Sequence, residues 1–293
     1  MTIKHLVISG GGPTLVQTLA SIQELERKKY IDRKEIQTIY GTSAGAILGI
    51  LLCLNMDWES INDYIIKRPW HEVFIISVQH VLDAYTKKGI FDHHIVEKCF
   101  KPLFDAKDIS MEITLEEFYQ YSKIELHVFA FEINQFQIED ISYKTHPTLS
   151  LMRAIQMTSA LPVIISPVFL DDKCYIDGGV VCNYPLKYCV EHHDSNEILG
   201  FKNKYDNFGK NHVRPTCTLL DFVMNFLFKI IYSLSTDNAQ PKIKNEFICN
   251  ATLMSIELLQ NSLKNIETRK TLFESGIQSA TDFLSTFEKE EEK

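Results

Sequence analysis

Ser43 lies at the centre of Gly41-Thr42-Ser43-Ala44-Gly45, which matches the G-x-S-x-G pattern of serine nucleophiles. A serine on a sharp turn between a strand and a helix has a strained backbone, and Gly41 and Gly45 let neighbouring chain pass close by. The N-terminus of the following helix also favours negative charge. The motif therefore predicts attack by the Ser43 hydroxyl on an acyl carbon. An ordinary strand-to-helix turn is the alternative interpretation.

Three consecutive glycines, Gly10, Gly11 and Gly12, follow a short apolar run near the start of the sequence. A dinucleotide-binding loop would need a glycine where Leu15 stands, and the Gly-Lys-Ser/Thr of a phosphate-binding loop is absent. Glycines present their backbone N–H groups without obstruction by a Cβ, and such groups can bind the oxyanion formed when a serine attacks an ester. We interpret the three glycines, together with the Ala44 amide, as an oxyanion hole.

Asp177 is followed directly by Gly178 and Gly179. Asp-Gly is a common turn dipeptide, and alone it indicates only a turn. Beside Ser43, however, a partly desolvated carboxylate could serve as the base, because burial raises the carboxyl pKa and therefore its basicity. We interpret Asp177 as that base, in an arrangement that needs no histidine.

The apolar pattern around these motifs predicts alternating strands and helices. Residues 5–9 and 37–40 are short apolar runs of strand length, whereas 14–29 has the spacing of an amphipathic helix. Residues 46–54 are apolar on all sides, which predicts a buried helix, and 126–133 is typical of a central strand. This alternation indicates a mainly parallel α/β sheet, in which the two glycine turns meet at one edge.

The composition excludes several classes of protein. With 293 residues, 45% of them hydrophobic, the chain can bury a sizeable core, and its net charge of −8 is unsuited to nucleic-acid binding. Seven scattered cysteines without a C-x-x-C pair predict reduced thiols in a cytoplasmic protein. The start of the sequence lacks the features of a signal peptide, and no apolar stretch is long enough to span a bilayer.

The segment 218–234 is the most apolar part of the chain. Its polar residues recur every four positions and form one narrow stripe, made of Asp221, Asn225, Lys229 and Ser233. The segment is too short and too charged to span a membrane. It is either a core helix with a solvent-facing stripe, which we favour, or a lipid-facing flank of the active-site mouth.

Histidines offer a rival base. A triad of the α/β-hydrolase type, in the order serine, acid, histidine, could use His192, His193 or His212. The serine turn here follows the second predicted strand, however, which is too early in the chain for the α/β-hydrolase fold. Adjacent histidines do not face the same way on a helix, and no H-E-x-x-H or Cys/His spacing occurs. We predict no metal and no cofactor.

Taken together, these motifs resemble the patatin-like phospholipase family, and the likeness runs from His5 to about Pro185. The family's glycine segment falls on Gly10 to Gly12, its nucleophile elbow on Gly41 to Gly45, and its Asp-Gly-Gly motif on Asp177 to Gly179. Two further segments, Ser159-Ala160-Leu161-Pro162 and Asn183-Tyr184-Pro185, also resemble family segments on either side of the aspartate. Three motifs in this order are strongly specific.

The resemblance implies a three-layer α/β/α sandwich and a lipid acyl hydrolase that uses a Ser43–Asp177 dyad and an acyl-enzyme. The expected substrates are glycerophospholipids or acylglycerols at a membrane or micelle surface, with at most transient peripheral contact of the protein. Two alternatives stay open, an acyltransferase with the same dyad and a catalytically weak lipid-binding module. The second is suggested by Thr14 and Leu15, which stand where the family usually has Arg-Gly.

The chain is expected to hold a catalytic domain over residues 5–200, with a helical C-terminal extension over 201–287 packed on it. Residues 288–293 are expected to form a charged tail.

Overall fold

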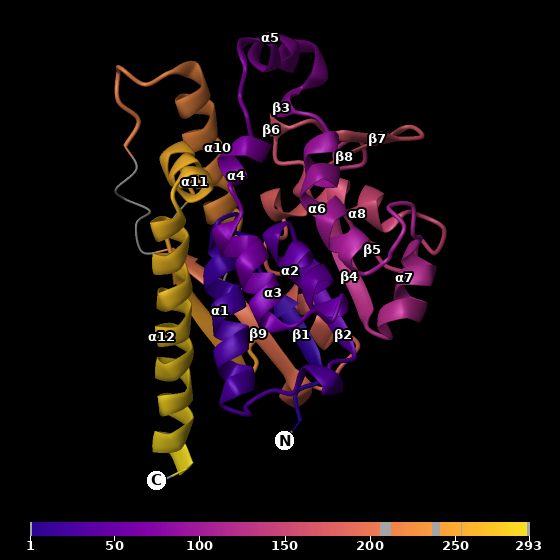
Figure 1. Cartoon of the computed structure of the whole chain (residues 1–293), viewed down its shortest axis with the longest axis vertical. Helices are drawn as coiled ribbons and strands as arrows, with labels where there is room; N and C mark the ends of the chain where they lie inside the picture. The colour runs from indigo at the N-terminus through magenta and orange to yellow at the C-terminus, as the bar shows by residue number, and fades with distance from the viewer. Residues whose placement is uncertain (1, 206–211, 236–240, 253, 292–293) are drawn as a thin grey trace.

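A central sheet of eight strands organises the computed structural model, which describes residues 2–205, 212–235, 241–252 and 254–291 (Figure 1). In spatial order its strands are β10 (Asn245–Ala251), β9 (Ile198–Tyr205), β1 (His5–Ile8), β2 (Thr38–Thr42), β4 (Glu125–Glu132), β8 (Lys173–Asp177) and β7 (Val168–Leu170), and β5 (Gln137–Ile141) also pairs with β4. The neighbours from β10 to β4 are parallel, whereas β8, β7 and β5 are antiparallel to their partners. The predicted mainly parallel α/β sheet is therefore confirmed.

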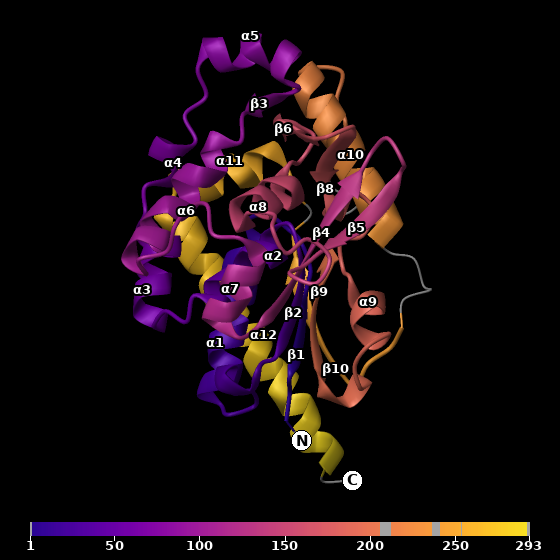
Figure 2. The ribbon, with the colours of Figure 1, turned by 90° about the vertical axis from the view of Figure 1, so that its right-hand side faces the viewer.

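Two hydrophobic cores lie on opposite faces of the sheet, because successive side chains of a strand point to opposite sides. Leu6 and Ile39 belong to the larger core, while their chain neighbours Val7 and Tyr40 belong to the smaller one. Helices α1 (Thr14–Arg27), α2 (Ala44–Cys53) and α8 (Leu151–Ser159) cover the first face, and α9 (Leu186–Val190) covers the second (Figure 2). This arrangement confirms the three-layer sandwich.

Helix α2 is buried along nearly its whole length. Of its residues only Ile47 is not buried, in agreement with a sequence that is apolar on all sides. Gly49 lets the helix approach the sheet closely, because a Cβ there would touch Ile39 and Leu126. A rigid helix packed directly on the sheet fixes the position of the residue at its N-terminus, Ser43.

The stretch between α2 and β4 forms a series of short elements, of which the first two agree with a helical pattern over 58–67. These are α3 (Trp58–Asn62), η2 (Asp63–Lys67), α4 (Trp70–Val73), α5 (Val78–Lys87), β3 (Gly89–Phe91), α6 (His94–Ala106) and α7 (Leu115–Ser122). Strand β3 pairs with β6 (Val163–Ile165) in a separate two-stranded sheet. This small sheet joins the inserted elements to the segment that leads into β8.

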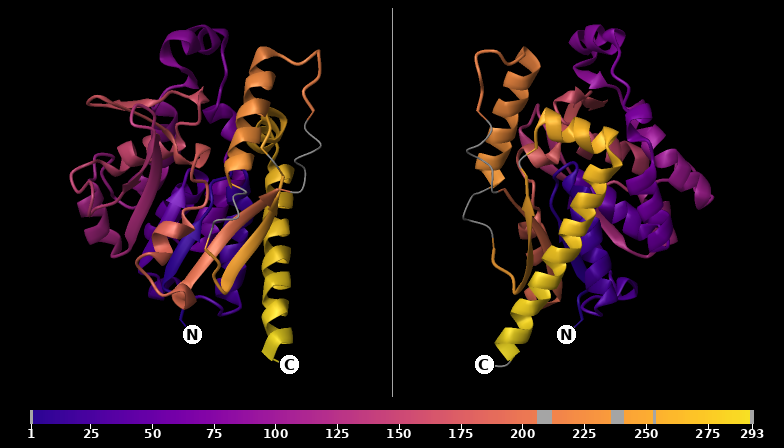
Figure 3. Two further views of the ribbon diagram at one scale, coloured as in Figure 1. Left: turned by 180° about the vertical axis from the view of Figure 1, so that it is seen from behind. Right: turned by 60° about the vertical axis from the view of Figure 1, so that its left-hand side comes forward.

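The C-terminal part differs from the expected helical extension over 201–287. Strand β9 crosses position 200, and β10 adds a parallel strand to the edge of the main sheet. Burial alternates along β10, with Phe247 and Cys249 buried and Ile248 exposed, so its sequence has the period of a strand and not of a helix. The helices of this part are α10 (Leu219–Ser235), α11 (Ile256–Lys264) and α12 (Ile266–Glu291), the last of which packs along α1 (Figure 3).

The charged tail expected over 288–293 begins inside α12, which continues to Glu291, and residues 292–293 lie outside the described residues. Among the described helices, none combines the length and the apolar character that crossing a bilayer requires.

Candidate active site

Ser43 occupies the turn between β2 and α2 with a backbone that few non-glycine residues adopt, φ 53° and ψ −123°. The turn is tight because α2 starts against the end of β1. A Cβ on Gly45 would collide with the carbonyl oxygen of Ile8, so only glycine fits at that position. The strained turn predicted from the G-x-S-x-G pattern thus has a physical cause in the contact between α2 and β1.

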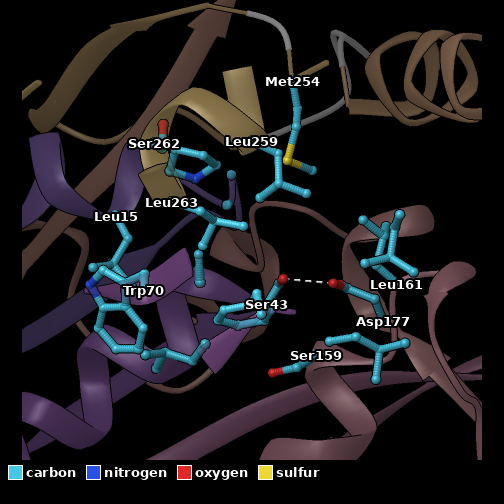
Figure 4. Close-up of a pocket in the computed structure, with 18 of the residues that line it drawn as sticks. Leu15, Ser43, Trp70, Ser159, Leu161, Asp177, Met254, Leu259, Ser262 and Leu263 are labelled. Atoms are coloured by element: carbon cyan, nitrogen blue, oxygen red, sulfur yellow. Dashed lines mark hydrogen bonds between the residues drawn. The ribbon is translucent and has the colours of Figure 1, made fainter. Parts of the chain in front are cut away.

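The hydroxyl of Ser43 donates a hydrogen bond of 2.6 Å to Oδ2 of Asp177 (Figure 4). Two strands bring these residues together across β4. Thr42, at the end of β2, pairs with Phe129, and Asp177, at the end of the antiparallel β8, pairs with the next residue, Ala130. The two side chains therefore reach the same level of the sheet from opposite strand directions.

Asp177 is buried, and burial raises the pKa of its carboxyl group to about 6. Hydrogen bonds from the Ser43 hydroxyl and from the Gly179 N–H, the latter 2.7 Å long to Oδ1, oppose this rise because they favour the ionised form. Gly178 permits the turn, since a Cβ there would collide with the carbonyl oxygen of Phe129. The result is a carboxylate that is ionised at neutral pH and more basic than an exposed aspartate.

The glycine segment approaches Ser43 from the end of β1, but its three amides are not equivalent. The Gly10 N–H donates to the carbonyl oxygen of Asn183 at 3.0 Å, so it is already occupied. The N–H groups of Gly11 and Gly12 have no acceptor within the part of the chain that the structure describes. Ala44 is the first residue of α2, and its N–H is one of those that a helix leaves without an internal partner.

These contacts correct the expectation for Gly10, which anchors the loop and leaves Gly11, Gly12 and Ala44 as the candidate oxyanion donors. Its carbonyl oxygen accepts hydrogen bonds from the side-chain amides of Asn183, at 3.0 Å, and Asn203, at 2.8 Å. An amide that already donates to a carbonyl cannot turn toward a substrate without losing that bond.

Thr14 and Leu15 occupy the first turn of α1, directly after the glycine segment. The buried Thr14 hydroxyl donates a hydrogen bond of 2.9 Å to the carbonyl oxygen of Gly11, and this bond holds the glycine loop against the start of α1. Leu15 lines the cavity beside Ser43. The two departures from the family pattern therefore give the loop an uncharged support and the cavity an apolar wall.

A cavity of about 380 Å³ opens onto Ser43 and Asp177, and most of the side chains around it are apolar (Figure 4). Its wall includes Leu15, Ile47, Trp70, Phe91, Phe100, Leu161, Phe228, Leu259 and Leu263. Arg269 also lines it, but this buried guanidinium donates to four backbone carbonyl oxygens, those of Ile66, Arg68, Ser262 and Leu263. An aliphatic chain fits such a wall better than a charged ligand does.

Of the three histidines considered as a rival base, His193 lies at the opposite end of the sheet from Ser43, and neither His192 nor His212 lines the cavity at Ser43. His193 stacks on His5, with ring centroids 3.7 Å apart, and its Nε2 lies 3.2 Å from the Tyr40 hydroxyl. His5 is the first residue of β1, and Ser43 follows the last residue of β2. Because the two strands are parallel, His5 and Ser43 lie at opposite ends of the sheet. Burial lowers the pKa of His193 to about 4. The structure therefore gives Ser43 a carboxylate partner and leaves His193 remote from it.

One group of possible metal ligands occurs among the described residues, made of His93, His94 and Glu97 at the start of α6. The two histidines come together because His93 precedes the helix and only His94 belongs to it. None of the three residues lines the cavity. The group is therefore separate from Ser43 and Asp177.

A family model for patatin-like phospholipases matches residues 6–190, more than half of the chain. The chain belongs to the patatin-like phospholipase family. The matched region contains the glycine segment, the elbow around Ser43 and the Asp177 turn.

Two viral proteins are similar to this chain. A probable lipid hydrolase of Invertebrate iridescent virus 6 is 26% identical over 193 residues, which cover 65% of this chain and 64% of that protein, so the chain spans less than two thirds of this relative. An uncharacterized protein of Acanthamoeba polyphaga mimivirus is 22% identical over 282 residues, or 94% of this chain and 92% of that protein. The crystal structure of VipD from Legionella pneumophila shares the fold, with a TM-score of 0.60 at 18% identity over 98% of this chain and 67% of that chain.

Two residues at the site were not singled out from the sequence, Thr158 and Asn203. The Thr158 hydroxyl accepts a hydrogen bond from the Ser43 N–H at 2.8 Å and donates one to the Phe129 carbonyl oxygen at 2.6 Å. Asn203 reaches the glycine segment from β9. Neither lies in a pattern that marks a site, although Thr158 directly precedes the family-like segment that begins at Ser159.

Proposed function

We propose that this protein is a serine lipid hydrolase that cleaves carboxylic ester bonds of glycerophospholipids or acylglycerols, with Ser43 as nucleophile and Asp177 as base. The observation that carries the proposal is the 2.6 Å hydrogen bond between the two side chains at an apolar cavity. The family and the probable lipid hydrolase among its relatives support the same class of reaction.

In the proposed mechanism Asp177 accepts the proton of the Ser43 hydroxyl while the serine oxygen attacks the ester carbonyl carbon. The N–H groups of Gly11, Gly12 and Ala44 stabilise the resulting oxyanion, and each such donor lowers the barrier by about 3 kcal/mol. When the C–O bond breaks, the leaving alcohol takes the proton from Asp177. Water then attacks the acyl-enzyme with Asp177 again as base, which releases a fatty acid and restores Ser43.

The choice of a lipid ester follows from the cavity wall. The side chains around the cavity offer apolar contact, and Arg269 is held by backbone carbonyl oxygens. An acyl chain would bury its methylene groups there, each contributing about 0.8 kcal/mol. The polar head of the lipid would then stay near the opening.

The seven cysteines are all free in the structure, which supports a reducing, cytoplasmic location.

Labelling with a fluorophosphonate probe tests the nucleophile. The wild-type protein should be labelled at Ser43, and Ser43→Ala should lose the label. Ser159 supplies the matched comparison, because it lines the same cavity and has a buried hydroxyl, so Ser159→Ala should still be labelled. A wild-type protein that is not labelled would favour a lipid-binding module instead of an enzyme.

Product analysis separates hydrolysis from acyl transfer, which the same dyad could catalyse. A phospholipid or acylglycerol is supplied with and without an added alcohol. Release of free fatty acid as the main product in both cases supports the hydrolase. Preferential formation of a new ester when the alcohol is present would identify an acyltransferase.

A further inference from the structure

Helix α5 presents an apolar face to solvent. None of its ten residues is buried, and its apolar side chains Val78, Val81, Leu82 and Tyr85 recur at the spacing that places them on one side of a helix. Leu82 is 65% exposed and Tyr85 is 93% exposed. An amphipathic helix normally buries this face in its own core, so the face of α5 is unpartnered in the described chain.

Helix α10 has a second exposed apolar face. Its inner side chains Met224 and Phe228 are buried in a small hydrophobic cluster. On the other side Leu219, Phe222 and Phe226 are 79%, 49% and 59% exposed. The helix is therefore apolar on two sides, which is not the pattern of the core helix favoured from its sequence. The alternative of a lipid-facing flank agrees better with this exposure.

Both faces lie at the end of the molecule where the cavity is. Figures 1 and 2 show α5 and α10 at the same end of the molecule, on different sides of it. Ile76 and Ile90, on either side of α5 in the sequence, line the cavity, and so do Leu220 and Phe228 of α10. More than half of the large exposed apolar side chains among the described residues come from 75–85 and α10.

We infer that these two helices form a docking surface for the polar–apolar interface of a lipid bilayer. The surface, here called the α5–α10 surface, comprises Val78, Val81, Leu82, Tyr85, Leu219, Phe222, Phe226 and Ile230. The inference rests on the proposed function, because a lipid ester must pass from its bilayer into the cavity. Insertion of the α5–α10 surface would place the cavity opening against the acyl chains, so that a substrate could enter without crossing water.

Charge decides which kind of lipid surface fits. Helix α5 carries one acidic and one basic residue, Asp83 and Lys87, which form an ion pair of 3.3 Å, and α10 carries Asp221 and Lys229. Each helix thus has no net charge when His80 of α5 is neutral, and the whole chain has a net charge of −8. Attraction to anionic lipid would need a surplus of basic residues. Docking should therefore depend on apolar insertion into zwitterionic lipid.

The geometry favours a bilayer over a second copy of the chain. Residues next to the exposed faces line the cavity itself, so a protein seated on the α5–α10 surface would cover the route to Ser43. A bilayer seated there would instead supply the substrate. A pair of helices with exposed large apolar side chains and a neutral polar stripe also fits the interfacial region of a membrane.

Vesicle flotation of the full chain tests the inference, in the Ser43→Ala background so that the lipid is not consumed. The vesicles contain phosphatidylcholine, alone or with added phosphatidylglycerol. The pairs Val78→Asp/Leu82→Asp on α5 and Phe222→Asp/Phe226→Asp on α10 should each lower the vesicle-bound fraction at least about tenfold. Leu82→Trp and Phe226→Trp keep the surface apolar and should keep binding. Ile277→Asp on α12 is the matched control away from the surface and should bind as the parent does.

Four outcomes would overturn the inference: unchanged binding of both aspartate pairs, an equal loss for Ile277→Asp, binding only when phosphatidylglycerol is present, or a dimer in solution that the aspartate pairs dissociate without any vesicle binding. Hydrolysis of a soluble short-chain ester, measured with Ser43 intact, separates this result from the proposed function. Normal ester hydrolysis without vesicle binding would overturn the docking surface alone. Vesicle binding without any ester hydrolysis would overturn the proposed function alone.

Discussion

The hydroxyl of Thr158, at the C-terminal end of α8, accepts a hydrogen bond from the backbone N–H of Ser43. The same hydroxyl donates to the carbonyl oxygen of Phe129 in β4. One side chain thus ties the strained turn to the central strand that separates β2 from β8. This contact holds the backbone of Ser43 while its hydroxyl points to Asp177, so Thr158 is a positioning residue.

Replacement of Thr158 by valine should therefore destabilise the protein and reduce activity. Valine has a similar shape but leaves the Ser43 N–H and the Phe129 carbonyl without partners, at a cost of roughly 2–3 kcal/mol in the free energy of unfolding. We expect kcat on a soluble ester to fall about tenfold with little change in KM. Thr158→Ser keeps the hydroxyl and should recover most of both losses. Equal activity of Thr158→Val and wild type would contradict the positioning role.

The pH dependence of hydrolysis follows from Asp177. Its carboxyl pKa is raised to about 6 by burial, and only the ionised carboxylate can accept the proton of Ser43. For an uncharged ester, log kcat/KM should be level above neutral pH and should fall by one unit per pH unit well below 6. A profile that is flat down to pH 4.5, or one that rises as pH falls, would argue against Asp177 as the base.

Asp177→Asn should abolish hydrolysis and yet stabilise the fold at neutral pH. The folded-state pKa lies above that of the unfolded chain, so the ionised carboxylate costs free energy in the native state above about pH 6. The asparagine variant removes this cost and should gain roughly 1–3 kcal/mol in denaturant unfolding at pH 8. The gain should shrink between pH 6 and 4, where the wild-type carboxyl becomes protonated in the folded protein. A gain that does not change with pH would point to another cause.

Gly12→Ala should impair the proposed oxyanion hole. Gly12 has a φ of 53°, which alanine adopts only with strain, and a Cβ there would touch the sulfur of Met254. We expect kcat to fall at least about tenfold, because the Gly11 and Gly12 N–H groups move away from the oxyanion. Met254→Ala in the same protein removes the contact but not the backbone strain, so it should restore only part of the loss. Full recovery in the double variant would mean that the steric contact alone was responsible.

The sequence was sufficient for features that depend on near neighbours along the chain. A tight turn around Ser43 requires small residues at fixed offsets, so it leaves a recognisable pattern. The burial of α2 was also predictable, because a helix without a polar side cannot face water. The family motifs follow from the same local requirements.

The tertiary structure decided which groups meet across the sheet and which surfaces stay uncovered. Asp177 arrives on an antiparallel strand, Asn183 occupies the Gly10 amide from 173 residues away, and β10 joins the sheet edge inside a segment expected to be helical. The apolar face of α5 looks in sequence like any helix that packs on a core, and only its exposure in the fold distinguishes it. Such features depend on contacts between distant segments, and a one-dimensional pattern records which residues are apolar or polar but not what each of them faces.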